Sequence, residues 1–555
     1  MSTGKNILFI MFDQLRFDYL SCAGHPHLHT PNIDWLASQG LRFTNAYVQS
    51  PVCGASRMSF YTGRYVSSHG AAWNGVPLKV GEITLGDHLR DLGMDAVLVG
   101  KTHMKADAKG MARLGLSPDS IIGARVSECG FDLYARDDGL WGMGKDGAYD
   151  PRPSPYNEYL KSRGYDGANP WHDYANSSID ADGDIASGWL YANATLPANI
   201  REDDSETPWL TRQAIDFIDS RGANDSPYLC HLSYIKPHWP YIVPAPYHNM
   251  YSADDFIPVN RHPDELIDPN PIYEAFAHNI IGKSFHREDV RHHVLTAYMG
   301  LIKQIDDQMG VLFDHLKKTD HLKDTIIILT SDHGDYMGDH WLGEKDLFHE
   351  PSVKVPLIIY DPSPDADPTR GQTCDALVEA IDLAASCIEW AGGHVPDEII
   401  EGRSLRPFLY GNMPDQWREV VVSEYDYSTT PMADQLQVSA KDARLFMIAD
   451  HRWTFIHAEG GLPPMLFDRL NDPNEWHDLG RDPAYHAQRE WGYQHLQDWA
   501  LRCAQRSTIS DKALVARRQN SRGTGIIIGA HDQNDVSDED MQFYRGKARQ
   551  NHLKE

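Results

Sequence analysis

Two short apolar segments, each followed by a carboxylate, constrain the fold of this chain most strongly. The first runs from Asn6 to Phe12 and ends in Asp13-Gln14, and the second runs from Thr325 to Thr330 and leads into Ser331-Asp332-His333-Gly334. Apolar runs of this length are typical of strands that are buried on both faces of a parallel sheet. Because ligands in open α/β sheets gather at the carboxyl ends of the strands, we expect both carboxylates at one site.

Strand-like runs alternate with helical patterns through the first two thirds of the chain. We predict further strands at 95–100, 228–234 and 354–360, helices at 31–39, 208–220, 289–318 and 378–391, and another element at 84–92, with Thr30 capping the first helix. Alternation of this kind predicts an α/β fold, in which helices cover both faces of a mostly parallel sheet.

The pattern of apolar and polar residues changes twice along the chain. We predict a large domain at 1–395, a smaller α+β domain at 396–504 with short strands at 419–423 and 445–448, and a polar arm at 505–555. The run Gly525-Ile526-Ile527-Ile528-Gly529 suggests that this arm docks on another subunit of a homo-oligomer, a dimer or a tetramer. The aperiodic stretch from 104 to 207 reads as an insertion that walls a substrate pocket or, equally, as a solvated surface loop.

Composition excludes several classes of partner. The formal net charge is −28 over 555 residues, so repulsion disfavours nucleic acid and anionic membranes. No apolar run approaches the ~20 residues that span a bilayer, and the amino terminus lacks a signal-peptide pattern, which predicts a cytoplasmic protein. The seven cysteines show no disulfide or metal spacing. An anionic substrate would therefore depend on local cations, and Arg57, Lys101 and Lys345 are the candidates.

The pentapeptide Cys53-Gly54-Ala55-Ser56-Arg57 puts a thiol and a permanent cation at the apparent start of a helix over 58–62. Free backbone N–H groups and the helix dipole favour an anion at such a position, so the segment is suited to an oxyanion ester. Taken alone, a cysteine is more often a small buried hydrophobe. The two strand-end carboxylates favour the functional interpretation.

With these residues in place, the chain resembles the formylglycine-dependent sulfatases and phosphonate monoester hydrolases of the alkaline phosphatase superfamily. The resemblance spans most of the chain. It is carried by Thr30-Pro31-Asn32-Ile33-Asp34 to Asn45-Ala46-Tyr47, Cys53 to Gly63, Gly100-Lys101-Thr102-His103, Ser331-Asp332-His333-Gly334, and Leu466-Phe467-Asp468 with Asn471-Asp472-Pro473-Asn474-Glu475. It implies a large alkaline-phosphatase-like domain and a smaller domain with a short antiparallel sheet.

The resemblance implies that a maturation enzyme oxidises Cys53 to formylglycine, whose hydrate attacks the ester. A serine or cysteine would form a stable enzyme ester, whereas a hydrate can expel sulfate by C–O cleavage. The family's usual signal is Cys-x-Pro-x-Arg, and this chain has Ala55 in place of proline. Alanine versions are known within the family.

The resemblance also implies a single divalent metal ion, bound by Asp13, Gln14, Asp332, His333 and the oxygen on residue 53. Oxygen ligands favour Ca²⁺, Mg²⁺ or Mn²⁺, and the imidazole shifts the preference toward Mn²⁺, so we expect Mn²⁺ or Ca²⁺. Many sulfatases have Asp and Asn where this chain has Gln14 and His333. In that respect the chain resembles the phosphonate monoester hydrolase branch.

The remaining candidates take their roles from the same resemblance. Arg57 would hold the formylglycine hydroxyl and the ligand carboxylates. Lys101 would bind a nonbridging oxygen, and His103 would take a proton from the hydrate, in a Gly-Lys-x-His pattern that resembles sulfatases more. His238 would protonate the leaving oxygen beside Lys345. Asn74 matches a residue of the phosphonate monoester hydrolase site, although Asn-Gly also suits a turn.

We therefore expect an arylsulfatase-type hydrolase that acts on a small anionic ester, with side activity on related oxyanions. Phosphonate monoester or phosphodiester hydrolysis by the same site is the alternative. A third hypothesis is a metal-binding but catalytically silent homologue, in which the Cys53 thiol stays intact.

Overall fold

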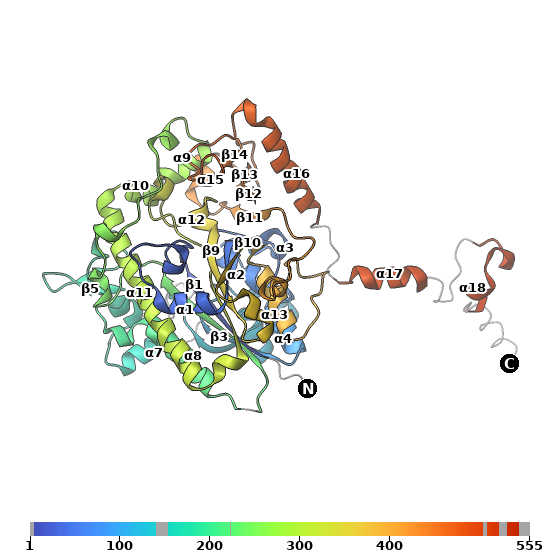
Figure 1. The fold of residues 1–555 in the computed structure, drawn as a ribbon, viewed down its shortest axis with the longest axis horizontal. Helices are drawn as coiled ribbons and strands as arrows, with labels where there is room; N and C mark the ends of the chain where they lie inside the picture. Colours follow the sequence, from blue (N-terminus) through green and yellow to red (C-terminus); the bar gives the residue numbers. More distant parts are fainter. Residues whose placement is uncertain (1–4, 140–153, 223, 503–507, 521–529, 543–555) are drawn as a thin grey trace. The chain divides into compact units, whose positions relative to one another are not determined.

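A computed structural model describes residues 5–139, 154–222, 224–502, 508–520 and 530–542 (Figure 1). The chain divides into two compact units, of which the first comprises 1–395 and 401–503 and the second comprises 396–400 and 504–555. In the second unit the described helices are α17 (Asp511–Asn520) and α18 (Asp538–Gln542). The apolar run 525–528, on which the predicted docking depends, lies outside the described residues.

An eight-stranded sheet forms the centre of the first unit, with the strand order β10-β2-β9-β8-β1-β7-β3-β4. The neighbours pair in parallel except for β9, which runs antiparallel to both β2 and β8. The prediction of a mostly parallel sheet is confirmed. Its strands are β1 (Asn6–Asp13), β2 (Leu41–Tyr47), β3 (Asp95–Gly100), β4 (Asp132–Arg136), β7 (Tyr228–Pro237), β8 (Thr325–Ser331), β9 (Lys354–Tyr360) and β10 (Gln372–Glu379).

Helices cover both faces of this sheet. Successive side chains of a strand point to opposite faces, so each strand contributes residues to the packing on both sides. On one face Leu8, Ile10 and Phe12 of β1 join a core that includes residues of α1 (Pro31–Gln39), α8 (Glu206–Asp219) and α11 (Glu288–Lys318). On the other face the ring of Phe9 lies 6.1 Å from that of Phe60 in α2 (Cys53–Thr62), which packs with α4 (Leu85–Asp91) and α13 (Asp382–Trp390).

The first helix is not capped as the sequence suggested. Thr30 makes no side-chain cap hydrogen bond to α1. The carboxylate of Asp306, on α11, instead accepts hydrogen bonds from the backbone N–H groups of Asn32 and Ile33 at 3.0 and 2.9 Å. The cap is thus tertiary and joins two helices on the same face of the sheet.

Two other predictions need correction. The predicted helix at 378–391 begins only at Asp382, because Val378 and Glu379 are the last residues of β10, which pairs with β2. The stretch from 104 to 207 is not wholly an insertion, since β4 forms the edge strand of the main sheet beside β3. In both cases, pairing with a strand that is distant in sequence determines the secondary structure.

The carboxyl-terminal part of the first unit carries a four-stranded antiparallel sheet, as predicted. Its strands, in spatial and chain order, are β11 (Val421–Asp426), β12 (Arg444–Ala449), β13 (Trp453–Ala458) and β14 (Met465–Asp468), and α16 (His486–Arg502) packs on β12 and β13. No helix within the described ranges is both long and apolar enough to cross a bilayer. The shorter elements are α3 (Val66–His69), α5 (Ala108–Leu114), α6 (Ile121–Ser127), α7 (Pro155–Ser162), α9 (Pro271–Ala277), α10 (Ile280–Phe285), α12 (Glu350–Val353), α14 (Arg406–Leu409), α15 (Pro431–Gln435) and the hairpin of β5 (Ser177–Ile179) and β6 (Ile185–Ser187).

Candidate active site

The carboxyl ends of β1 and β8 place the two predicted carboxylates side by side. The strands pair in parallel as far as Phe12 and Ser331, so Asp13 and Asp332 leave the sheet at the same edge. One ligand atom from each of Asp13, Cys53, Asp332 and His333 lies within 4.8 Å of the others, and all four residues are buried. The expectation that both strand ends form one site is confirmed.

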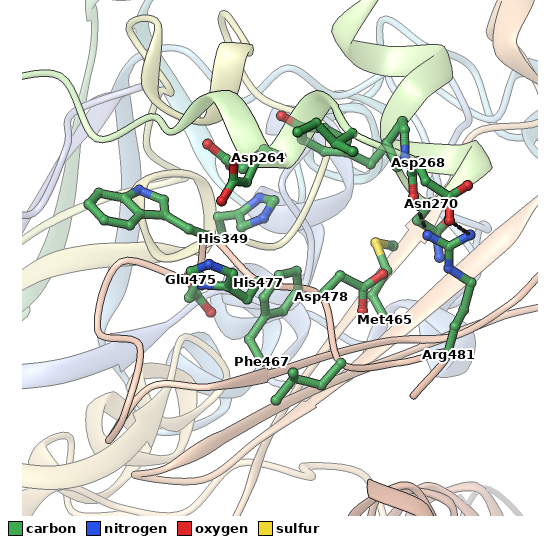
Figure 2. A pocket seen from close by; sticks show the side chains of 16 residues that line it. Asp264, Asp268, Asn270, His349, Met465, Phe467, Glu475, His477, Asp478 and Arg481 are labelled. Atoms are coloured by element: carbon green, nitrogen blue, oxygen red, sulfur yellow. Dashed lines mark hydrogen bonds and ion pairs between the residues drawn. The ribbon is translucent and has the colours of Figure 1, made fainter. Parts of the chain in front are cut away.

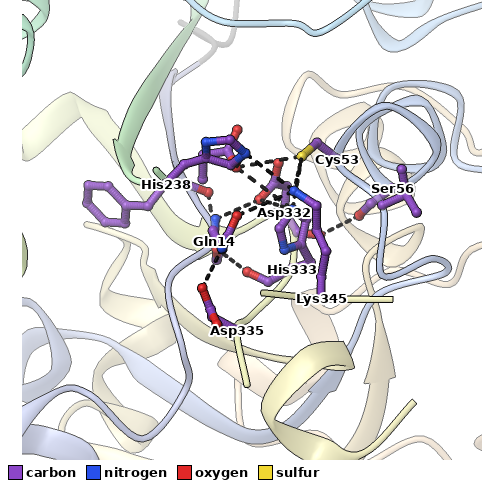
Figure 3. Close-up of polar contacts among 12 residues, drawn as sticks. Gln14, Cys53, Ser56, His238, Asp332, His333, Asp335 and Lys345 are labelled. Carbon is purple, nitrogen blue, oxygen red and sulfur yellow. Dashed lines mark hydrogen bonds and ion pairs between the residues drawn. The ribbon is translucent and has the colours of Figure 1, made fainter. Parts of the chain in front are cut away.

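Cys53 lies at the first residue of α2 and points into this cluster (Figure 3). Its Sγ is 3.0 Å from Nε2 of His333 and 3.8 Å from Oδ1 of Asp13, and it accepts a hydrogen bond from Nζ of Lys345 at 3.1 Å. Burial raises the pKa of the Cys53 thiol to about 11, despite the neighbouring lysine. The thiol is therefore a weak nucleophile at neutral pH.

Arg57, one helical turn further along α2, links the two strand ends from below the cluster. Its guanidinium is fully buried and donates to Asp332 Oδ2 at 2.8 Å and to Asp13 Oδ2 at 3.1 Å. Its third nitrogen donates to the Ser233 hydroxyl at 2.7 Å and to the Lys101 carbonyl at 2.9 Å. The planar fork of an arginine suits this set of acceptors, so Arg57 fixes the geometry of both carboxylates.

Asp13 is ionised in this setting. Burial opposes its charge, but the cations of Lys101 and Arg57 outweigh burial and hold the pKa of Asp13 well below its usual range. The nearest cation is the ammonium of Lys101, 2.6 Å from Oδ2. Lys101 follows β3 directly, so three neighbouring strands, β1, β7 and β3, bring charged groups to one edge.

His103 lies two residues beyond Lys101 and is also buried. Burial, followed by the charge of Lys101, lowers the pKa of His103 well below its ordinary value, so the imidazole is neutral. A neutral imidazole is the form that accepts a proton. His103, Lys101, His238, Lys345 and Asn74 line one cavity of about 690 Å³.

His238 and Lys345 form a pair beside Cys53. The Nδ1–H of His238 donates to the carbonyl of Trp239 at 2.6 Å, so Nε2 carries the lone pair and accepts from Nζ of Lys345 at 3.3 Å. Burial lowers the pKa of His238 well below its usual value. The imidazole is therefore neutral before substrate binds, and Lys345 holds the proton of this pair.

Asn74 lies in the predicted turn and borders the cavity, while its place in a substrate site stays a prediction. Its side-chain oxygen accepts a hydrogen bond at 2.8 Å from the backbone N–H of Gly54, in the first turn of α2. Asn74 also lies in a turn with Gly75, whose φ is 76°. The side chain thus fixes the start of the helix that carries Cys53.

The cluster fits a divalent cation. Nδ1–H of His333 donates to the Gly334 carbonyl at 2.8 Å, and burial lowers the pKa of His333, so Nε2 faces the cluster unprotonated. An imidazole held through its other nitrogen is the usual arrangement of a metal-ligating histidine. Gln14 presents Oε1 to the same cluster, 3.3 Å from Nζ of Lys345. Oxygen donors with one imidazole suit Mn²⁺ better than Zn²⁺.

Four tryptophans wall the cavity above the cluster. Trp171, Trp189 and Trp239 form a chain of rings, with centroids 6.3 and 5.1 Å apart, and Trp73 stands opposite Tyr425 at 5.6 Å. Asp138, Gly139, Trp171 and Trp189 all belong to the stretch from 104 to 207. Part of this stretch therefore lines the cavity, and its role in walling a substrate pocket stays a prediction.

Sequence reasoning missed several of these residues. Trp171 and Trp189 lie in an aperiodic stretch in which no pattern distinguishes them. Trp239 had a signal, because it follows His238 directly. Asp335 also had one, since it lies three residues beyond Asp332 in the same segment, and it contacts Gln14.

A second cavity, of about 310 Å³, lies between the segment 264–273 and the end of β14 (Figure 2). Five of its sixteen lining residues carry carboxylates, and one of them, Asp268, pairs with Arg481 at 3.3 Å. The five predicted site residues that border a described cavity all border the first one.

Comparison with known proteins identifies the family. The model of the Sulfatase family matches residues 5–393, and that of the N-sulphoglucosamine sulphohydrolase C-terminal region matches 338–499. The chain therefore belongs to the sulfatase family, within the alkaline phosphatase superfamily. The sulfatase family generally uses a divalent metal and formylglycine.

Individual relatives include both activities that the motifs suggested. The multifunctional alkaline phosphatase superfamily protein PehA of Trinickia caryophylli is 31% identical over 94% of this chain and 99% of its own. An arylsulfatase of Clostridium perfringens is 28% identical over 86% of this chain and 91% of its own. The solved phosphonate monoester hydrolase of Silicibacter pomeroyi superposes with a TM-score of 0.79 at 27% identity, over 92% of this chain and 98% of its own.

Proposed function

We propose that this protein hydrolyses sulfate monoesters, aryl sulfates among them, with a formylglycine at position 53 and one divalent metal ion. The observation that carries the proposal is a pair of ammonium groups, one at the nucleophile and one at Asp13 beside it. Lys345 Nζ lies 3.1 Å from Cys53 Sγ, and Lys101 Nζ lies 2.6 Å from Asp13. Fixed cations that face a transferred oxyanion stabilise the charge that develops in the transition state.

Maturation of Cys53 is a two-electron oxidation that exchanges sulfur for oxygen and requires a separate enzyme with an external oxidant. Water then adds to the aldehyde and gives two hydroxyls on one carbon. One hydroxyl attacks the ester sulfur, and the alcohol leaves with a proton. Removal of the proton from the other hydroxyl breaks the C–O bond to the sulfate, which releases sulfate and regenerates the aldehyde.

The two histidines divide the proton transfers between these steps. His238 accepts a hydrogen bond from Lys345, and both residues lie beside the nucleophile. This pair is therefore placed to give a proton to the leaving oxygen. His103 is a buried residue of the same cavity and would take the proton from the second hydroxyl. The two roles call for opposite protonation states, because one step gives a proton to the departing alcohol and the other takes a proton from the second hydroxyl.

Asp13, Gln14, Asp332, His333 and the residue-53 oxygen would hold the metal ion, Mn²⁺ or Ca²⁺. When bound there, the ion would lower the pKa of the attacking hydroxyl and polarise the ester. Arg57 would keep the carboxylates of Asp13 and Asp332 oriented toward the ion, through ion pairs of 3.1 and 2.8 Å respectively.

The organic part of the substrate would lie against the tryptophans. Trp73, Trp189 and Trp239 offer aromatic faces in a cavity whose wall also carries Asp138, Glu344 and Asp346. The described lining residues include only two lysines, Lys101 and Lys345, and both are used for the oxyanion. Such a wall favours a neutral aromatic alcohol over a polyanionic sugar.

Hydrolysis of phosphonate monoesters or phosphodiesters is the second candidate function. Gln14 and His333, the residues in which the chain resembles that branch, contact Lys345 and Cys53 at the cluster, and the structural similarity to a phosphonate monoester hydrolase supports this candidate. Lys101 and His103 support the sulfatase. The shared oxyanion site predicts side activity on whichever class is not preferred.

Steady-state kinetics on matched esters test the choice. We expect kcat/KM on 4-nitrophenyl sulfate to exceed that on 4-nitrophenyl phenylphosphonate in the Mn²⁺-loaded, matured protein. A strong preference for the phosphonate would transfer the assignment to the second candidate. Replacing Lys101 with alanine should reduce sulfate hydrolysis about 10²-fold or more, since one oxyanion contact is worth that much.

Mass spectrometry of the peptide that carries residue 53 tests for a catalytically silent homologue. We expect a mass loss that corresponds to exchange of sulfur for oxygen with loss of two hydrogens. Retention of the thiol in an active preparation would contradict the formylglycine mechanism. Retention in an inactive preparation that still binds Mn²⁺ would support the silent homologue. The homo-oligomer stays a prediction, which light scattering of the full chain can test.

A further inference from the structure

The side-chain amide of Gln14 is held from behind by two residues that no motif identified. Its Nε2 donates to the hydroxyl of Tyr241 at 3.0 Å and to the carboxylate of Asp335 (Figure 3). All three side chains are buried. Tyr241 lies just beyond β7 and Asp335 just beyond β8, so the contacts join loops at two strand ends.

An amide side chain can face a partner with either its nitrogen or its oxygen, and the partner decides which one. A carboxylate only accepts hydrogen bonds, so Asp335 requires the nitrogen of Gln14 on its side. The hydroxyl of Tyr241 donates to Oδ2 of Asp335 at 2.6 Å, which leaves its own lone pairs toward Gln14. Both partners therefore select the same orientation of the amide.

This orientation turns Oε1 of Gln14 toward the cluster of Asp13, Cys53, Asp332 and His333. The nearest described donor to Oε1 there is Nζ of Lys345, at 3.3 Å. We propose that Asp335 is a positioning residue that keeps the oxygen of Gln14, not the nitrogen, facing the metal site. The proposal rests on the metal-binding role proposed above for Gln14.

The backbone of Gln14 is held independently of Asp335. Its N–H donates to Oδ1 of Asp332 at 3.0 Å, and its carbonyl accepts from the hydroxyl of Tyr298 at 2.7 Å. The φ of Gln14 is 68°, so these bonds hold it in the left-handed region. Removing the carboxylate of Asp335 should therefore release the amide and leave the backbone in place.

Asp335 is itself fixed by groups other than Gln14. Oδ1 accepts the backbone N–H of Met337 at 2.9 Å, and Oδ2 accepts the Tyr241 hydroxyl. An asparagine at this position can keep one acceptor and offers an amide N–H₂ in place of the other. That N–H₂ would attract the oxygen of Gln14 away from the metal site.

The test measures Mn²⁺ affinity by isothermal titration calorimetry of the metal-free full chain. We expect Asp335→Asn to weaken Mn²⁺ binding about 10- to 100-fold, the usual cost of losing a partner that orients a metal ligand. Asp339→Asn is the matched control in the same loop, because Asp339 pairs with Arg16 at 2.7 Å and accepts the Asn260 N–H at 2.8 Å. The control should bind Mn²⁺ like the wild type.

A double-mutant cycle separates positioning from a structural effect. In a Gln14→Ala background, Asp335→Asn should have no further effect on the Mn²⁺ dissociation constant, since the amide that it orients is gone. An equal loss in both backgrounds, or no loss in the wild-type background, overturns the inference. If Asp335→Asn does not fold, Tyr241→Phe replaces it in the same cycle, with a smaller expected loss.

The cycle also distinguishes this inference from the proposed function. A wild-type chain that binds no divalent cation would contradict the metal site itself. A wild-type chain that binds Mn²⁺ tightly while Asp335→Asn binds it equally well would contradict only the positioning role.

Discussion

The carboxylate of Asp138 accepts a hydrogen bond from the backbone N–H of His103 at 3.0 Å, and His103 has a φ of 57°. The same oxygen accepts the N–H of Thr102 at 3.1 Å, so one carboxylate closes the turn that follows β3. Asp138 is in turn held at 2.6 Å by Arg136, which pairs with Glu128 at 2.7 Å. A non-glycine residue in the left-handed region needs such support.

Replacing Asp138 with alanine should therefore impair catalysis through His103. We expect kcat to fall about 10²-fold, the scale of a misplaced catalytic group, while Mn²⁺ affinity stays unchanged. Asp138→Asn keeps the accepting oxygen and should retain most of the activity. Stopped-flow kinetics and calorimetry on both variants check this. Equal losses in the two variants would show that the charge of Asp138, not the turn, is what matters.

His103→Ala should stall the enzyme after the first chemical step. The alcohol is released before the proton is taken from the second hydroxyl, so the sulfated enzyme should accumulate. We expect a burst of 4-nitrophenol of about one equivalent, followed by turnover slowed about 10²- to 10⁴-fold. Rapid-quench kinetics and intact-mass analysis check this. A slow linear release without a burst would assign His103 to the first step.

His238→Ala should impair the first step in a way that depends on the leaving group. An alcohol of high pKa needs a proton as it departs, whereas 4-nitrophenolate does not. We expect a loss of about 10²-fold or more on phenyl sulfate and a much smaller one on 4-nitrophenyl sulfate. A Brønsted plot over substituted phenyl sulfates measures the effect. Parallel plots for the variant and the wild type would contradict the assignment.

Trp189→Ala should affect the organic part of the substrate and not the chemistry. Its ring lies 5.1 Å from that of Trp239, and its Nε1–H donates to His172 at 3.2 Å, so it forms a fixed wall of the cavity. We expect kcat/KM on 2-naphthyl sulfate to fall about fivefold, because a lost aromatic contact costs about 1 kcal/mol. The value for methyl sulfate should change little. A uniform loss on both esters would indicate a structural effect.

The parts of this site that depend on strand ends could be predicted from sequence. Asp13 and Asp332 follow buried apolar runs, and the parallel pairing of those runs makes their carboxyl ends coincide. The boundary of α13 could not be predicted, since the apolar residues of β10 continue into it and only the pairing of Val378 with Ala46 separates the two elements. Local periodicity carries no information about such a partner.

Side chains that act from a distance in sequence were beyond the same reasoning. Asp306 caps α1 from more than 270 residues away in sequence. Tyr241 precedes α11 in the sequence and Asp335 follows it, yet both contact Gln14. Hydrogen bonds of this kind are decided by tertiary packing, so no spacing rule predicts them. Motif resemblance predicted the ligands, whereas the side chains that contact Gln14 from behind became visible only in the structure.

The last prediction concerns the stability of the smaller sheet. Burial raises the pKa of Glu424, in β11, from 4.5 to about 7, and the charge of Glu401 acts in the same direction. The N–H and hydroxyl of Ser67 and the charge of Arg502 lower this pKa but do not outweigh burial. A carboxyl whose folded pKa is raised stabilises the fold fully below its unfolded pKa of 4.5. That contribution is lost as the pH rises through 7, and it amounts to about 3 kcal/mol.

Glu424→Gln should remove this pH dependence, because the amide cannot ionise. Relative to the wild type, the variant should therefore gain thermal stability between pH 5 and pH 8, whatever its stability at pH 5. Unfolding midpoints from calorimetry at both pH values measure the change. Glu490→Gln, at an exposed position on α16, is the matched control and should follow the wild type. Parallel pH profiles for Glu424→Gln and the wild type would show that Glu424 is ionised in the folded protein already at pH 5.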